Sequence, residues 1–79
     1  MDKHLTVYPI STGKELNIFS DDAIQHVKIM DMSGNIVYDR NSDHKTRNII
    51  DINHLENATY IVEVSFDNMR KSRSLFVKS

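Results

Sequence analysis

A chain of 79 residues has room for one small domain, and its core is thin because it buries only about 60–65% of the surface that the unfolded chain exposes. A core of this size rarely encloses a substrate cleft of the usual ~300 Å³ or more, which disfavours an enzyme. The formal net charge of −1 disfavours a nucleic-acid-binding protein, and the absence of cysteine excludes disulfides and cysteine-based zinc sites. We therefore predict one non-catalytic domain over residues 1–79.

The dominant pattern along the chain is short segments of alternating apolar and polar residues. This period-2 alternation predicts β-strands with one buried and one solvated face. In chain order the predicted strands are residues 5–8, 14–20, 25–31, 36–39, 46–52, 60–66 and 72–78. About seven short strands of even spacing, with no convincing helix, predict an all-β, immunoglobulin-like β-sandwich of antiparallel strands.

Turn residues mark the connections between these strands. Pro9 ends the first strand because it cannot donate to a sheet ladder, and Ser11–Gly13 predicts the first turn. Ser20–Asp22 is predicted to break the second strand from the third. Met32–Asn35 predicts a hairpin in which Gly34 takes a positive φ. The remaining predicted connections are a polar loop at 40–45, a segment at 53–59 and a tight turn at 67–68.

Few residues offer chemistry. The four histidines are His4, His26, His44 and His54, and none has the spacing of a metal pair, so all four are predicted to be solvated. Asp39-x-Asn41-x-Asp43 resembles the start of a calcium loop, but the glycine and glutamate that such a loop requires later are missing. Nothing in the sequence indicates a nucleophile, a phosphate-binding loop or an acid–base pair, so no catalytic residue and no cofactor are predicted.

The order of the signals is similar to a known family. The chain resembles the type A C-terminal sorting domain of proteins exported by the bacterial type IX secretion system. The resemblance extends from Leu5 to Lys78. It rests on five segments: residues 5–9, 27–37, 50–57, 60–64 and 75–78.

The resemblance implies a function and a set of residues. Such a domain directs a parent cargo protein, which precedes it in the chain, through the periplasm and across the outer membrane of a Gram-negative bacterium. The cargo is then secreted or attached to the cell surface, and the partners are proteins of the secretion machinery. The residues that match recurrent family positions, and are expected to contribute to recognition, are Pro9, Gly34, Tyr60, Leu75, Val77 and Lys78. Packing in the core is an alternative role for Tyr60, Leu75 and Val77.

Alternatives to a sorting signal remain open. Ile10-Ser11 and Ala58-Thr59 depart from the family pattern, which favours a non-catalytic accessory sandwich that packs against or spaces a parent enzyme. A carbohydrate- or calcium-binding sandwich is a third hypothesis. The basic residues of the last strand protect a sheet edge from aggregation or bind a partner, and the sequence does not decide between the two. An isolated domain with exposed sheet edges is also expected to form a weak homodimer.

Overall fold

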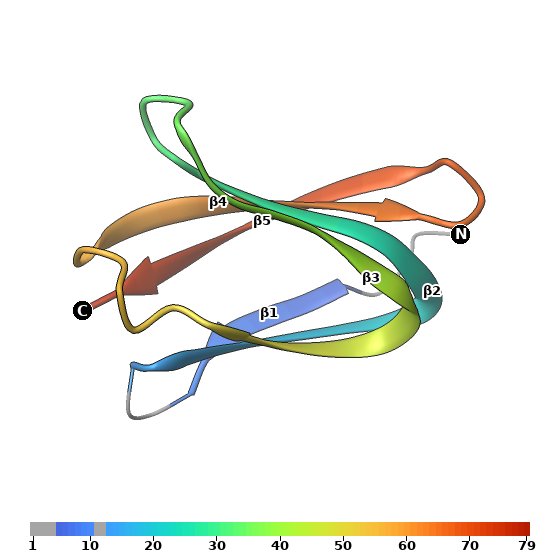
Figure 1. Cartoon of the computed structure of the whole chain (residues 1–79), viewed down its shortest axis with the longest axis horizontal. Helices are drawn as coiled ribbons and strands as arrows, with labels where there is room; N and C mark the ends of the chain where they lie inside the picture. The colour runs from blue at the N-terminus through green and yellow to red at the C-terminus, as the bar shows by residue number, and fades with distance from the viewer. Residues whose placement is uncertain (1–4, 11–12) are drawn as a thin grey trace.

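The computed structural model describes residues 5–10 and 13–79, and within them five antiparallel strands form two packed layers (Figure 1). The strands are β1 (Leu5–Pro9), β2 (Glu15–Asp31), β3 (Ile36–Asp51), β4 (Ala58–Phe66) and β5 (Lys71–Lys78). Within the described residues, no helix is long and apolar enough to cross a membrane.

The two longest strands contribute to both layers. The first arm of β2 pairs with β1 and with the last arm of β3, whereas the second arm of β2 pairs with β4 and with the first arm of β3. β5 completes the second layer by pairing with β4. In Figure 1, β2 and β3 curve from one layer into the other at one side of the molecule. The prediction of an all-β sandwich with two packed layers of antiparallel strands is therefore confirmed.

The predicted number of strands is wrong, because five strands replace the predicted seven. Residues 20–22 and 40–45, predicted to break strands, instead lie at the bends of β2 and β3. The ladder shifts register between Phe19 and Ile24, and Asp43 and His44 have positive φ values of 54° and 62°. Irregularities of this kind bend a strand without ending it.

The core contains mainly the residues that alternation assigned to the inner faces. Four of them come from β4, where Tyr60, Val62, Val64 and Phe66 are all buried. The other buried hydrophobic residues are Leu16, Ile18, Ile24, Val27, Ile29, Ile50, Ile52 and Phe76. Since these residues form one cluster, both layers share a single apolar interior.

The turns have the geometry that their sequences require. In the β2–β3 hairpin, Gly34 N–H donates to Asp31 O at 3.0 Å, and Gly34 has φ +92°. The Asp31 carboxylate accepts the backbone N–H groups of Ser33 and Asn35, both at 2.9 Å, which fixes the turn further. The predicted hairpin is confirmed, whereas Ser11 and Thr12 of the predicted first turn lie outside the described residues.

Candidate recognition surface

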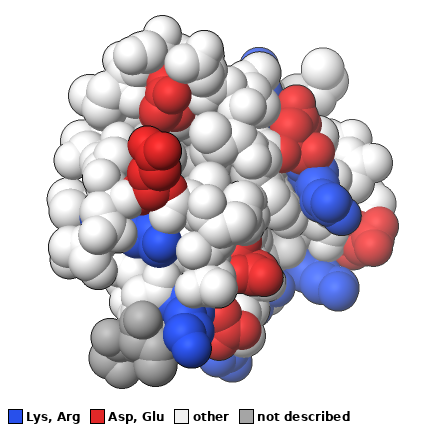
Figure 2. All heavy atoms as spheres, turned by 60° about the vertical axis from the view of Figure 1, so that its left-hand side comes forward, with Lys and Arg blue, Asp and Glu red and all other residues white. Residues whose placement is uncertain are grey.

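Most of the six predicted recognition residues lie at one pole of the sandwich. The end of β1, the β2–β3 hairpin, the β3–β4 connection and the end of β5 all lie on this side of the molecule (Figure 1). Pro9, Val77 and Lys78 line one shallow hollow of about 190 Å³ at this pole. Acidic and basic side chains alternate over the face in Figure 2, so no large surface of one charge appears there.

Tyr60 and Lys78 hold the β3–β4 connection in place. The buried Tyr60 donates its hydroxyl to Glu56 O at 2.6 Å, and its ring stacks on Phe76 with a centroid distance of 5.3 Å. The ammonium group of Lys78 donates to Leu55 O at 2.6 Å and to Asn53 O at 3.4 Å. Both side chains therefore have intramolecular contacts that account for them without a partner.

In β5, Leu75 and Val77 point to the outside of the sandwich and not into the core. Leu75 and Val77 are 58% and 59% exposed, whereas Phe76 between them is only 4% exposed. The alternative role of Leu75 and Val77 in the core is therefore wrong. The reason is the register of the last hairpin, which places Phe76 opposite the buried Tyr60.

Pro9 and Gly34 act through their backbone conformation, Pro9 at the end of β1 and Gly34 in the β2–β3 hairpin. Pro9 is the last residue of β1 and is half-buried, so the predicted end of this strand is confirmed. Gly34 has open space where a side chain would begin, so only its positive φ requires glycine.

The outer face of the second layer carries a row of apolar side chains. Cross-strand pairs connect Ile36 with Met30, Met30 with Ile61, and Ile61 with Leu75. Each of the four strands contributes one member, and Val77 extends the apolar area along β5. Ile36, Leu75 and Val77 are exposed, so this row is open to contact.

A row of alternating charges runs beside the apolar row. Cross-strand pairs connect Asp39 with Lys28, Lys28 with Glu63, and Glu63 with Arg73. Arg73 Nε donates to Glu63 Oε2 at 2.8 Å, and Lys28 Nζ lies 4.0 Å from Glu63 Oε1. The hydrogen bond from Arg73 lowers the pKa of the Glu63 carboxyl below its ordinary value of 4.5 against the opposing effect of burial.

The calcium-loop pattern has a different use in the structure. Asp39 and Asn41 lie in β3 and present their side-chain oxygens to the two ring nitrogens of His26, with Nδ1 of the ring 2.9 Å from Asn41 Oδ1. These hydrogen bonds, first that to Asn41 and then that to Asp39, raise the pKa of His26 above 6.5. His44 contacts Asp67, and His4 lies outside the described residues. In the part of the chain that the structure describes, no three His, Asp or Glu residues are grouped to hold a metal ion.

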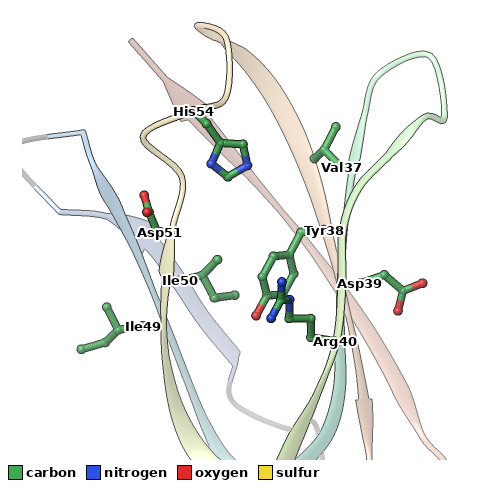
Figure 3. Close-up of a pocket in the computed structure, with 8 residues that line it drawn as sticks. All are labelled: Val37, Tyr38, Asp39, Arg40, Ile49, Ile50, Asp51 and His54. Atoms are coloured by element: carbon green, nitrogen blue, oxygen red, sulfur yellow. The ribbon is translucent and has the colours of Figure 1, made fainter.

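A second hollow lies between the two arms of β3. This cleft has a volume of about 560 Å³, and Figure 3 shows Tyr38, Ile50 and His54 directed toward it, with Asp39 turned away. The Arg40 guanidinium lies 5.9 Å from the centre of the Tyr38 ring. None of the six predicted recognition residues lines this cleft.

The comparison with protein families shows which family the chain belongs to. The family model described as the secretion system C-terminal sorting domain matches residues 6–78. The chain belongs to this family. This match confirms the resemblance seen in the sequence. The sorting domain directs the secretion of a parent cargo through the type IX system. Cargo of this system is secreted or attached to the cell surface in Bacteroidetes, and the family is non-catalytic.

Solved structures support the fold of the sorting domain. It is similar to the crystal structure of a DUF3244 family protein with an immunoglobulin-like β-sandwich fold from Bacteroides vulgatus ATCC 8482. The TM-score is 0.76 at 20% identity, over 99% of this chain and 92% of that chain. It is also similar to CopC from Methylosinus trichosporium OB3b, with a TM-score of 0.55 at 14% identity, over 98% and 88% of the two chains. At these identities the likeness concerns the fold, and it confirms the immunoglobulin-like class. No curated protein sequence matches the chain at a significant level.

Sequence reasoning missed the buried Phe76 and the two rows on the outer face of the sorting domain. A signal for Phe76 was present, because Arg73, Leu75 and Val77 share one phase of the alternation and a charged residue belongs on the wet face. The apolar row had a weaker signal in Ile61, which is out of phase with the buried residues of β4. The partners of Ile61 on other strands depend on register, which local pattern does not give.

Proposed function

We propose that this chain is a working export signal, recognised as a folded unit by proteins of the type IX machinery, for a parent cargo that precedes it. The observation that carries the proposal is that the family match over residues 6–78 coincides with two exposed apolar residues, Leu75 and Val77, at a matched family segment. In this proposal the parent reaches the periplasm of a Gram-negative bacterium first. The folded domain then directs the parent protein across the outer membrane.

Within the six candidate residues, we assign two kinds of role. Leu75 and Val77 contact the machinery, because their side chains are exposed and a partner would cover them. Tyr60, Lys78, Gly34 and Pro9 act indirectly by fixing the connection, the hairpin and the strand end around that surface. Substitutions in the second group are expected to affect export only as far as they affect folding.

One further hypothesis competes with an active signal. An accessory sandwich would keep the fold and pack against or space a parent secreted enzyme without acting as the export signal, and the departures Ile10-Ser11 and Ala58-Thr59 favour it. Ala58 and Thr59 begin β4 opposite Lys78 and Val77, so this departure lies directly beside the proposed contact. A weak homodimer stays a prediction, and gel filtration over a range of concentrations tests it.

A reporter fusion tests the proposal. Residues 1–79 are placed at the C-terminus of a periplasmic fluorescent reporter, in a strain with a working type IX system and in a secretion-deficient strain. We expect reporter at the surface or in the medium of the competent strain alone. Retention of folded reporter in the periplasm of both strains would favour the accessory sandwich.

A pair of matched variants tests the assignment of the contact. Leu75→Ser and Ile49→Ser each remove one exposed apolar side chain, the first from the proposed contact and the second from the other layer. We expect Leu75→Ser to reduce export and Ile49→Ser to leave it unchanged, with both variants as stable as the original domain. Equal export of the two variants would contradict the role given to Leu75.

A further inference from the structure

β5 is the terminal strand of its layer and carries a defined set of outward groups. Among the described strands it forms a ladder with β4 alone, and β1 of the other layer lies near its other edge without pairing to it. Its alternation places basic and apolar side chains together on the outer face. In chain order these side chains are Lys71, Arg73, Leu75 and Val77.

The same four residues direct their backbone groups toward the free edge. The β4–β5 hairpin closes with Phe66 N–H donating to Arg70 O at 2.8 Å. In an antiparallel ladder, hydrogen-bonded and non-hydrogen-bonded pairs alternate from such a closing pair. The non-hydrogen-bonded positions of β5 are therefore Lys71, Arg73, Leu75 and Val77. Their N–H and C=O groups therefore point away from β4, and no described strand forms a ladder with them.

The rows on the outer face define what the next strand would carry. The apolar row ends at Leu75, so an added strand continues it with an apolar residue. The charge row alternates Asp39, Lys28, Glu63 and Arg73, so its next member is acidic. The Lys71 side chain is exposed and its charge, after the hydrogen bond from Arg73, helps to lower the pKa of Glu63, so a second acid on the added strand would face a basic side chain here too.

We propose that the free edge of β5 binds an extended segment of another protein by antiparallel strand addition. In its own chain direction this segment presents two apolar and then two acidic side chains at alternate positions. The antiparallel direction is chosen because every strand pair of the sheet is antiparallel. Strand addition supplies affinity through main-chain hydrogen bonds and specificity through alternate side chains.

Charge complementarity gives this edge its selectivity. Basic side chains on an edge strand oppose pairing with edges of the same charge. Lys71 and Arg73 therefore exclude basic segments and admit acidic ones. The proposal deepens the proposed function and rests on it, because the occupant would belong to the secretion machinery.

Hydrogen exchange tests the edge directly. The probe is the peptide Thr-Val-Thr-Val-Thr-Glu-Thr-Glu-Thr, and the control replaces both Glu residues by Lys. We expect the amides of Arg73, Leu75 and Val77 to exchange rapidly in the free domain and to be protected by the probe. In the control peptide, two exposed charge contacts change from attraction to repulsion. We therefore expect its affinity for the domain to be about tenfold lower than that of the probe. Protection of β5 by neither peptide, or equal protection by both, would overturn the proposal.

Charge exchange provides a matched variant. Lys71→Glu should weaken binding of the Glu peptide and strengthen binding of the Lys peptide. Lys45→Glu, on the exposed bend of β3 that β2 and β4 separate from β5, should change neither. Protection of the β5 amides that grows with domain concentration in the absence of peptide would show that a second copy occupies the edge, and would overturn the proposal. The reporter fusion is read separately. Export without peptide protection removes only the edge proposal, whereas peptide protection without export removes only the sorting function.

Discussion

Lys78 matches a recurrent family position, yet its ammonium group contacts backbone carbonyls of the β3–β4 connection. The carbonyl of Leu55 accepts at 2.6 Å, and Lys78 itself is half-buried. Replacing one member of such a contact costs about 1 kcal/mol of unfolding free energy, because the other member loses its hydrogen bond. We expect Lys78→Met to show this loss in urea denaturation. Lys71→Met, which removes a charge from an exposed side chain, should change stability by less than about 0.5 kcal/mol. Equal stability of both variants would contradict the structural role of Lys78.

At the same scale, the sequence predicts Gly34 better than Lys78. A glycine in a hairpin turn predicts a positive φ from local chemistry, and Gly34 has one. The contact of Lys78 joins residues separated by 23 positions, so no local pattern could indicate it. Residues with a local physical reason were therefore predictable, and those that act through tertiary contacts were not.

At the scale of the element, β5 buries the face that carries Phe76 and exposes the face that carries Leu75 and Val77. Phe76 is buried against Tyr60, and its neighbours Leu75 and Val77 are exposed. Phe76→Ala should cost about 3–5 kcal/mol because it opens a cavity and removes the aromatic contact. Leu75→Ala, on the same strand, should stay within about 0.5 kcal/mol. Thermal or urea denaturation distinguishes these outcomes, and comparable losses for the two variants would contradict the observed phase of β5.

The long strands show why the number of elements was wrong while their positions were right. The predicted segments at 14–20 and 25–31 correspond to the two arms of β2, and those at 36–39 and 46–52 to the arms of β3. Local polarity at Ser20–Asp22 resembles a turn, because bends and turns use the same residues. Whether the chain reverses or continues into the other layer there depends on pairing with β4 and β1, which lie elsewhere in the sequence.

At the scale of the whole molecule, three titratable groups with shifted pKa values set the expected pH dependence of stability in the acid and neutral range. Hydrogen bonds from Asn35 lower the pKa of Asp31 below 3.8, the bond from Arg73 lowers that of Glu63 below 4.5, and those to Asn41 and Asp39 raise that of His26 above 6.5. The carboxylates stabilise the fold fully above their unfolded values, and this contribution is lost as pH falls through their folded values. The His26 contribution is complete below 6.5 and is lost as pH rises through its folded value. We therefore expect a plateau of maximal stability between pH 4.5 and 6.5, with a decrease on either side.

Variants separate the two sides of this profile. Only a doubly protonated His26 ring can donate to both oxygens that face it, so His26→Gln should remove the decrease above pH 6.5 and leave the acid side unchanged. Arg73→Gln removes the main cause of the lowered Glu63 pKa and should flatten the acid side, where the contribution of Asp31 remains. Denaturation midpoints measured from about pH 3 to pH 8 test both, and an NMR titration of the His26 ring gives its folded pKa directly. If His26→Gln alters the acid side or keeps the neutral decrease, another group controls that part of the profile and the hydrogen bonds of His26 do not.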